Sequence, residues 1–284
     1  MARVTSATKT LQEYGRGIIG GLLFSLPLIY TMEVWWAGFI ASAEALLACI
    51  GFTFLLLLGY NRFAGMRRDA TFGDLCWDSV EEIGLAIFVS FIFLLLIGQI
   101  EFSMSAHEIL GKTVTESMIV AVGISVGTAQ LGPSGSKETG MEGNEGKFAA
   151  IFEVIILSIC GATLFGSAVA PTEEILLIAI NCSPGQLLLM VLLSLGLCAV
   201  ICFFSEFRGR GNRGSSWFQM AGIVALIYSL SVMVSLLMLI FFRRTDGSGF
   251  YIIAAQTIVL AIPASIGASA GRLIIDGNYG ESKK

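Results

Sequence analysis

The chain has 284 residues, of which 55% are hydrophobic and 13% charged, with a formal net charge of −4 and a mean hydropathy of +0.82. So apolar a composition excludes a water-soluble domain, because too few polar side chains remain to cover its surface. The sequence therefore predicts an integral membrane protein.

Apolar runs of about 20 residues recur along the chain, which is the length that a helix needs to cross roughly 30 Å of hydrocarbon. The runs are continuously apolar and do not alternate every second residue, so they predict helices and not the strands of a membrane barrel. In chain order they are Gly17–Trp36, Phe39–Tyr60, Ile83–Ile100, Thr115–Leu131, Phe148–Ala170, Gln186–Ser205, Trp217–Phe242 and Tyr251–Gly271. We expect an all-α, polytopic transmembrane helix bundle of about eight spans.

Lysine and arginine are unevenly divided between the two sides of this predicted bundle. With eight spans and an inner amino terminus, all of them lie inside except Lys112, Arg243 and Arg244. Such a bias is expected of a membrane protein whose cytoplasmic segments are positive, and it predicts two cytoplasmic termini. A seven-span topology that moves Arg243 and Arg244 inward remains the alternative.

Several kinds of chemistry lack their usual residues in this sequence. The six cysteines show no Cys-x-x-Cys spacing, and His107 is the only histidine, so we expect no haem or zinc site and no cofactor. The chain has no Gly-x-x-x-x-Gly-Lys-Ser/Thr phosphate loop, and no lysine falls inside a predicted span. The sequence therefore predicts that the protein is not an enzyme.

The chain resembles itself at a shift of about 140 residues. Residues Gly20–Val34 match Gly161–Ile175 at a shift of 141, and Ala121–Ala129 match Ala261–Ser269 at a shift of 140. These collinear matches predict an internal duplication of a four-helix repeat. The predicted repeats are residues 1–131 and 148–284, joined by a Gly-rich inner linker, 132–147. Because four spans return the chain to its starting side, the two repeats are expected to be parallel.

One carboxylate, Glu33, interrupts the apolar stretch "SLPLIYTMEVWWAG" just before a hairpin predicted at Ala37–Phe39. The self-alignment matches Glu33 with Glu174, and a threonine stands two residues before each. Either the two acids are interfacial anchors, or they line a polar cavity that binds a cation or a proton. Glu116, next to the start of the fourth predicted span, is expected near the outer surface. The predicted ion-binding residues are Glu33, Glu174, Glu44, Glu173, Thr31 and Thr172.

The leading functional hypothesis is a secondary transporter or exchanger of cations that uses the paired glutamates. Two carboxylates that share a desolvated site either hold a cation between them or let a proton compete for it. A passive ion channel and a non-transporting membrane scaffold or sensor subunit remain as alternatives. The predicted partners are the lipid bilayer and a small cation or proton, and no nucleic acid.

The stretch "FSLPLIYTMEVWW", residues 24–36, resembles a family of bacterial integral membrane proteins of unknown function, and the resemblance covers nearly the whole chain. It implies a multi-pass protein of the bacterial inner membrane. It implies no activity and no site residues.

Overall fold

The computed structural model describes residues 7–65, 70–130, 147–209 and 217–279. All regular structure in these residues is helical, which confirms the prediction of an all-α membrane protein. The chain divides into two compact units, Met1–Glu142 and Gly143–Lys284, called unit 1 and unit 2 below, and each is described by itself. The predicted linker, 132–147, lies outside the described residues except for Lys147.

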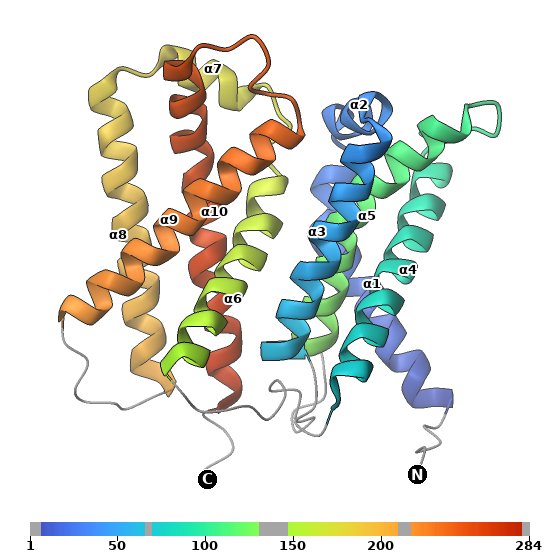
Figure 1. Ribbon diagram of the computed structural model, residues 1–284, viewed down its shortest axis with the longest axis horizontal. Coiled ribbons are helices and arrows are strands. Elements are labelled where there is room, and N and C mark those ends of the chain that lie inside the picture. Colours follow the sequence, from blue (N-terminus) through green and yellow to red (C-terminus); the bar gives the residue numbers. More distant parts are fainter. Residues whose placement is uncertain (1–6, 66–69, 131–146, 210–216, 280–284) are drawn as a thin grey trace. The chain divides into compact units, whose positions relative to one another are not determined.

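Unit 1 consists of four long helices and a short one (Figure 1). They are α1 (Ala7–Ile29), the short α2 (Met32–Ile40), α3 (Ala43–Tyr60) with a following π-helical turn η1 (Asn61–Gly65), α4 (Phe72–Leu96) and α5 (Ala106–Gln130). Helix α5 contacts the other four helices. Of its membrane-length window, 89% is buried inside the protein, against 22 to 50% for the other spans. Helix α5 is therefore the central element of unit 1.

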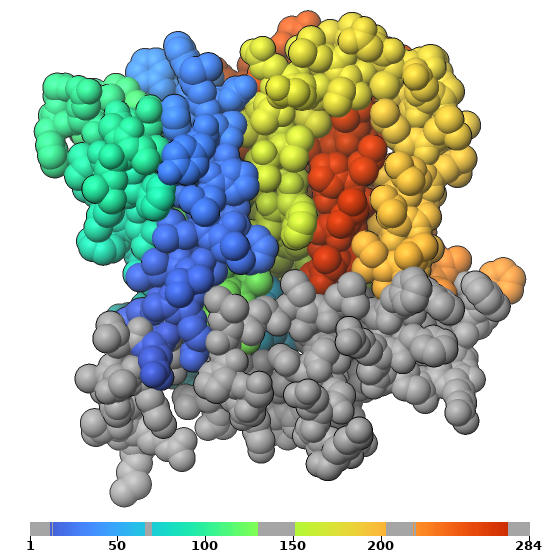
Figure 2. Space-filling model, turned by 180° about the vertical axis from the view of Figure 1, so that it is seen from behind, coloured from blue at the N-terminus to red at the C-terminus, as the bar shows by residue number. Residues whose placement is uncertain are grey.

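Unit 2 has the same succession of elements (Figure 1). They are α6 (Lys147–Ser167), the short α7 (Glu174–Asn181), α8 (Pro184–Gly209), α9 (Trp217–Phe241) and α10 (Phe250–Tyr279). Helix α10 contacts the other four, and Figure 2 shows it in red between α6 and α8. This shared order is what a duplication would produce, and the duplication itself stays a prediction.

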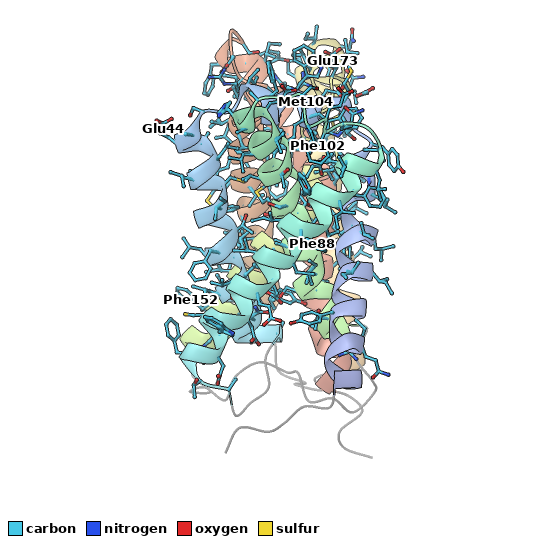
Figure 3. All side chains as sticks on the ribbon, turned by 90° about the vertical axis from the view of Figure 1, so that its right-hand side faces the viewer. Glu44, Phe88, Phe102, Met104, Phe152 and Glu173 are labelled. Carbon is cyan, nitrogen blue, oxygen red and sulfur yellow. The ribbon has the colours of Figure 1, made fainter. Side chains whose placement is uncertain are left out.

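Six of the described helices are long and apolar enough to cross a membrane. They cover Ala43–Gly65, Phe72–Leu96, Ala106–Ala129, Pro184–Cys202, Met220–Phe241 and Phe250–Gly271. Helices α1 and α2 together would add a seventh span, and α6 contributes a shorter apolar stretch, Ile151–Ser167. The described helices thus give six or seven spans, where the sequence predicted about eight. Exposed side chains such as Leu47, Phe88 and Leu189 form the apolar surface that such helices turn to lipid (Phe88 is labelled in Figure 3).

The first predicted span is broken in the structure. Helix α1 ends at Ile29, Thr31 has an extended backbone (φ −98°, ψ 110°), and α2 continues at an angle of 88° to α1. The backbone N–H of Thr31 donates to the carbonyl of Leu28, and its hydroxyl takes the carbonyl of Pro27 that the next helical N–H would have bonded. The helical ladder therefore stops here. The predicted unbroken helix Gly17–Trp36 and the hairpin at Ala37–Phe39 are therefore wrong, because the chain bends between α1 and α2, and α2 continues through Ala37–Phe39 to Ile40.

The third predicted span, Ile83–Ile100, begins too late. Helix α4 begins at Phe72, behind a capping box in which Thr71 and Asp74 exchange side-chain and backbone hydrogen bonds. The prediction looked for apolar runs, and the first three turns of α4 contain several polar residues, so it missed this start. As a consequence Glu82, which the prediction placed before the span, lies well inside α4.

The fourth predicted span, Thr115–Leu131, also begins too late. Helix α5 begins at Ala106, so its membrane-length segment includes Lys112. The prediction that no lysine lies in a span is therefore wrong. The same shift moves Glu116 from the predicted outer boundary to the middle of the helix.

The main helix crossing of each unit depends on a pair of glycines. A β-carbon on Gly20 would lie 2.4 Å from the Cα atom of Gly127, where α1 crosses α5. In unit 2 a β-carbon on Gly161 would lie 2.1 Å from the carbonyl oxygen of Gly267, where α6 crosses α10. Only glycine allows backbones to approach so closely. The self-alignment matches Gly20 with Gly161 and Gly127 with Gly267.

We expect Gly20→Ala to destabilise the protein by about 1–3 kcal/mol, because the added methyl group forces α1 and α5 apart. Thermal unfolding of the detergent-solubilised protein measures the effect. Gly51→Ala is the matched control, since nothing lies within 4 Å of a β-carbon at that helical glycine. Equal melting temperatures for the two variants would contradict the close crossing.

Candidate functional site

The two acids that the self-alignment pairs lie at matched places in their own units. Glu33 is half-buried in the first turn of α2, and Glu174 is exposed in the first turn of α7. A carboxylate in a first turn interacts favourably with the partial positive charge of the helix N-terminus. The repeated acid therefore has a structural explanation in both units.

The two predicted threonines donate hydrogen bonds to the backbone. The hydroxyl of Thr31 donates to the carbonyl of Pro27, and that of Thr172 donates to the carbonyl of Val169 at 2.8 Å. Both bonds lie where the long helix of the unit ends and the short helix follows. Their position indicates that these threonines shape the turn between the two helices.

The supporting acids lie on the surface at the same helix starts. Glu44 is exposed in the first turn of α3, where Figure 3 shows it projecting away from the helices, and Glu173 is exposed just before α7. Glu33 and Glu44 belong to unit 1, whereas Glu173 and Glu174 belong to unit 2. A site that joins Glu33 and Glu174 therefore stays a prediction. The described residues contain no group of three or more His, Cys, Asp or Glu that could hold a metal ion.

A different carboxylate, Glu116, is enclosed in the centre of unit 1. Among the described residues it is the only acid whose side chain is fully buried. It lies near the middle of the 24-residue apolar segment Ala106–Ala129. Both carboxylate oxygens are buried, and neither has a hydrogen-bond partner. An unpartnered carboxylate is costly in such surroundings, so its presence calls for an explanation other than packing.

Glu116 lies on the face of α5 that packs against α1. A β-carbon on Gly21 would touch Val120 and Ile124, and Glu116 shares the face of Val120 because it precedes it by four residues. The two helices are antiparallel, since Gly17 lies against the later residues Ile124 and Thr128. One turn beyond the Gly21–Val120 contact, Ser25 and Glu116 therefore lie at the same level of this interface.

Further polar groups in the interior of unit 1 have unused hydrogen-bonding capacity. The hydroxyl oxygens of Ser25 in α1, Ser90 in α4 and Thr115 in α5 are buried without a partner. Buried hydroxyl groups are normally hydrogen-bonded. Together with Glu116 they give the core of unit 1 a polar character that packing alone does not require.

A partly buried ion pair lies toward the end of unit 1 that carries α2. Lys112 Nζ is 2.8 Å from Glu108 Oε1 and donates to the carbonyl oxygen of Gln99 at 3.1 Å. Glu108, Lys112 and Glu116 follow one another at four-residue intervals, so each is about 6 Å further along α5. Glu108 and Lys112 pair with each other, whereas no described basic side chain forms an ion pair with Glu116.

Unit 2 has a neutral side chain at the place that matches Glu116. The shift of 140 residues pairs Glu116 with Gln256 in α10. Gln256 is fully buried, and neither its Nε2 nor its Oε1 atom has a partner. Each unit thus carries one enclosed, unpartnered polar side chain here, and only that of unit 1 can ionise.

Sequence reasoning missed Glu116 because it set the start of the fourth span at Thr115 and so placed the acid at the membrane boundary. A signal was available in the repeat. The register that matches Ala121 with Ala261 also places Glu116 over Gln256, and two long polar side chains in equivalent apolar segments mark a shared interior position.

The comparisons with known proteins agree with a membrane protein. No curated protein and no solved structure matches the chain. A family model described as "Putative integral membrane protein (DUF2391)" matches residues 13–275, and the matched segment includes the helices of both units. This match confirms the resemblance to a family of integral membrane proteins of unknown function. The chain therefore belongs to this family of integral membrane proteins.

Proposed function

We propose that this protein is a secondary transporter or exchanger of protons or small cations, and that Glu116 binds the transported ion in the middle of the membrane. The proposal is supported by one observation above all, the fully buried and unpartnered carboxylate near the centre of a span. Ionisable side chains at this depth are costly and mark ion pathways in membrane proteins. The protein is then a transporter and not an enzyme.

The chemistry of the site fits this role. Binding a proton or a cation removes the cost of an unpaired charge at Glu116, and release restores the charge when the site opens to water. The hydroxyl oxygens of Ser25 and Thr115 are available to add hydrogen bonds or cation contacts, since both lack a partner.

The acids predicted from the sequence keep a supporting part in this proposal. Glu33 and Glu44 lie at the short-helix end of unit 1, and Glu173 and Glu174 lie at the short-helix end of unit 2. Negative charges at an entrance raise the local concentration of cations. Thr31 and Thr172 hold the turns that present these acids. We further propose that the two units arose by duplication and that unit 2 lost the ionisable side chain.

Reconstitution into liposomes tests the proposal. A pH indicator trapped inside reports proton flux after a potassium diffusion potential is imposed, and the assay is repeated with gradients of Na⁺, K⁺ and Ca²⁺. We expect flux above that of protein-free liposomes, with a rate that saturates as the ion concentration rises. A rate that rises without limit would indicate a passive channel instead. No flux with any of these ions would contradict transport.

We expect the double variant Glu33→Gln/Glu174→Gln to raise the half-saturating cation concentration about two- to fivefold and to leave the maximal rate unchanged, because entrance charges act by attraction. High salt should remove the difference, since it screens exposed charges. Glu101→Gln is the control, an exposed acid outside these helix starts. A maximal rate that falls to zero in the double variant would instead place the ion-binding site at these acids.

A further inference from the structure

A second enclosed polar cluster in unit 1 lies on the opposite face of α5 from Glu116. Ser125 follows Glu116 by nine residues, or two and a half helical turns, so it lies on the opposite side of the helix and about 14 Å further along it. The cluster joins three elements, since Asn61 comes from η1, Ser79 and Glu82 from α4, and Ser125 from α5. It is called the Asn61 cluster below.

The amide of Asn61 is the centre of the cluster. Its Nδ2 atom donates to Glu82 Oε2 at 2.8 Å and to Ser79 Oγ at 3.3 Å. Ser125 Oγ donates to its Oδ1 atom at 2.6 Å. Asn61, Ser79 and Ser125 are each at most 2% exposed. Oxygens of two helices, α4 and α5, therefore converge on the side chain of Asn61 from η1.

No described basic side chain forms an ion pair with the carboxylate of Glu82 in this cluster. The ion pairs Lys112–Glu108 and Arg243–Asp246 both lie outside the cluster. A carboxylate within a helix bundle is expensive to keep charged without a positive partner. One bound positive charge would remove this cost.

We propose that the Asn61 cluster is a binding site for a small monovalent cation of the Na⁺ kind. The ligands are the carboxylate of Glu82 and the side-chain oxygens of Asn61, Ser79 and Ser125. The amide hydrogens of Asn61 now lie between Glu82 and Ser79, where they hold two acceptors together. Turning the amide by 180° brings Oδ1 to that place and lets Nδ2 donate to Ser125 Oγ. The cation then replaces the amide hydrogens as the positive group between these oxygens.

The backbone around Asn61 supports a binding role. Asn61 begins a π-helical turn, a feature that is rare and frequent at functional sites. A β-carbon on Gly65 would lie 2.2 Å from Asn61 Oδ1, so the glycine leaves the amide room that any other residue would fill. A single carboxylate matches a single positive charge, whereas Ca²⁺ takes six to eight oxygens, several of them from acids.

This site is independent of the transport proposed for Glu116. It requires only that the cation reaches the Asn61 cluster, and the cation can serve there as a structural ion, as a regulator or as the coupling ion of transport. Binding is therefore measured without any flux assay.

Thermal unfolding of the purified full-length protein tests the site. At constant pH and ionic strength, we expect about 100 mM Na⁺ in place of choline to raise the melting temperature by about 3–5 °C, with Li⁺ and K⁺ as further arms. Glu82→Gln should lose this shift. Glu81→Gln is the matched control, the adjacent and exposed carboxylate of the same helix, and should keep it.

Two results would overturn the site: equal melting temperatures in Na⁺ and choline, or a full Na⁺ shift in Glu82→Gln. Ser125→Ala removes only one oxygen and serves if Glu82→Gln does not fold; its Na⁺ shift should fall by about half or more, and an unchanged shift would count equally against the site. Glu116→Gln should keep the full shift, so a failure of transport and a failure of the Asn61 cluster are told apart.

Discussion

Replacing Glu116 with glutamine is expected to reduce ion flux to the level of protein-free liposomes. Glutamine has nearly the shape and length of glutamate, but it cannot release a proton or offer a negative charge to a cation. The variant is expected to fold, because Gln256 occupies the matched position in unit 2 as a fully buried amide. Flux is measured with the trapped pH indicator at equal amounts of reconstituted protein.

Two further variants show whether a loss of flux is specific to the carboxylate of Glu116. Glu101→Gln removes an exposed acid close to the start of α5 and should keep the wild-type flux. Glu116→Asp keeps the charge but withdraws it by one methylene group, so part of the flux should remain, with altered preference among cations. Wild-type flux in Glu116→Gln would remove this residue from the ion pathway.

The proposed role of Glu116 makes the two units unequal. Both carry an enclosed polar side chain without a partner at matched positions of α5 and α10, but that of unit 2 is the neutral Gln256. Since only Glu116 of this matched pair can ionise, the proposed role has each chain bind one proton or one monovalent cation at this position per cycle. The amide keeps the shape of the interior in unit 2 without adding a second charge to be neutralised.

The helix class was predictable because lipid offers the backbone no hydrogen-bond partners, so a long apolar run must form a helix. Helix boundaries were less so, because they depend on capping and on polar first turns that lie within the helix. Thr71 and Asp74 form such a start for α4, and the spacing T-x-x-D is visible in the sequence. Using this signal would have extended α4 by three turns and placed Glu82 inside it.

The candidate site was harder to predict, for two physical reasons. The repeated Thr-x-Glu pattern at Glu33 and Glu174 suggested a cavity, but both acids begin a short helix, and a helix start favours such residues in any location. The depth of Glu116 depends on where α5 begins, and nine residues separate the predicted start from the observed one. The Asn61 cluster needs the pairing of three helix faces, which no local pattern contains.

Replacing Glu116 with an apolar residue is expected to raise the free energy of unfolding, although it abolishes flux. Glu116→Met should stabilise the protein by about 1–4 kcal/mol, because methionine fills a similar volume and removes a buried polar group that has no partner. The loss of flux should be as complete as in Glu116→Gln. Chemical or thermal unfolding in detergent, followed at one pH, measures the gain.

Gln256→Met is the matched variant in unit 2 and should stabilise by about 1–2 kcal/mol, less than Glu116→Met because only a neutral amide is removed. A residue kept for packing supplies stability, so its replacement costs free energy. A residue kept for ion binding does the reverse, since the fold carries the cost of an unsatisfied group that a bound ion relieves. A loss of stability in Glu116→Met would therefore mean that Glu116 holds unit 1 together, and the transport site would have to lie elsewhere.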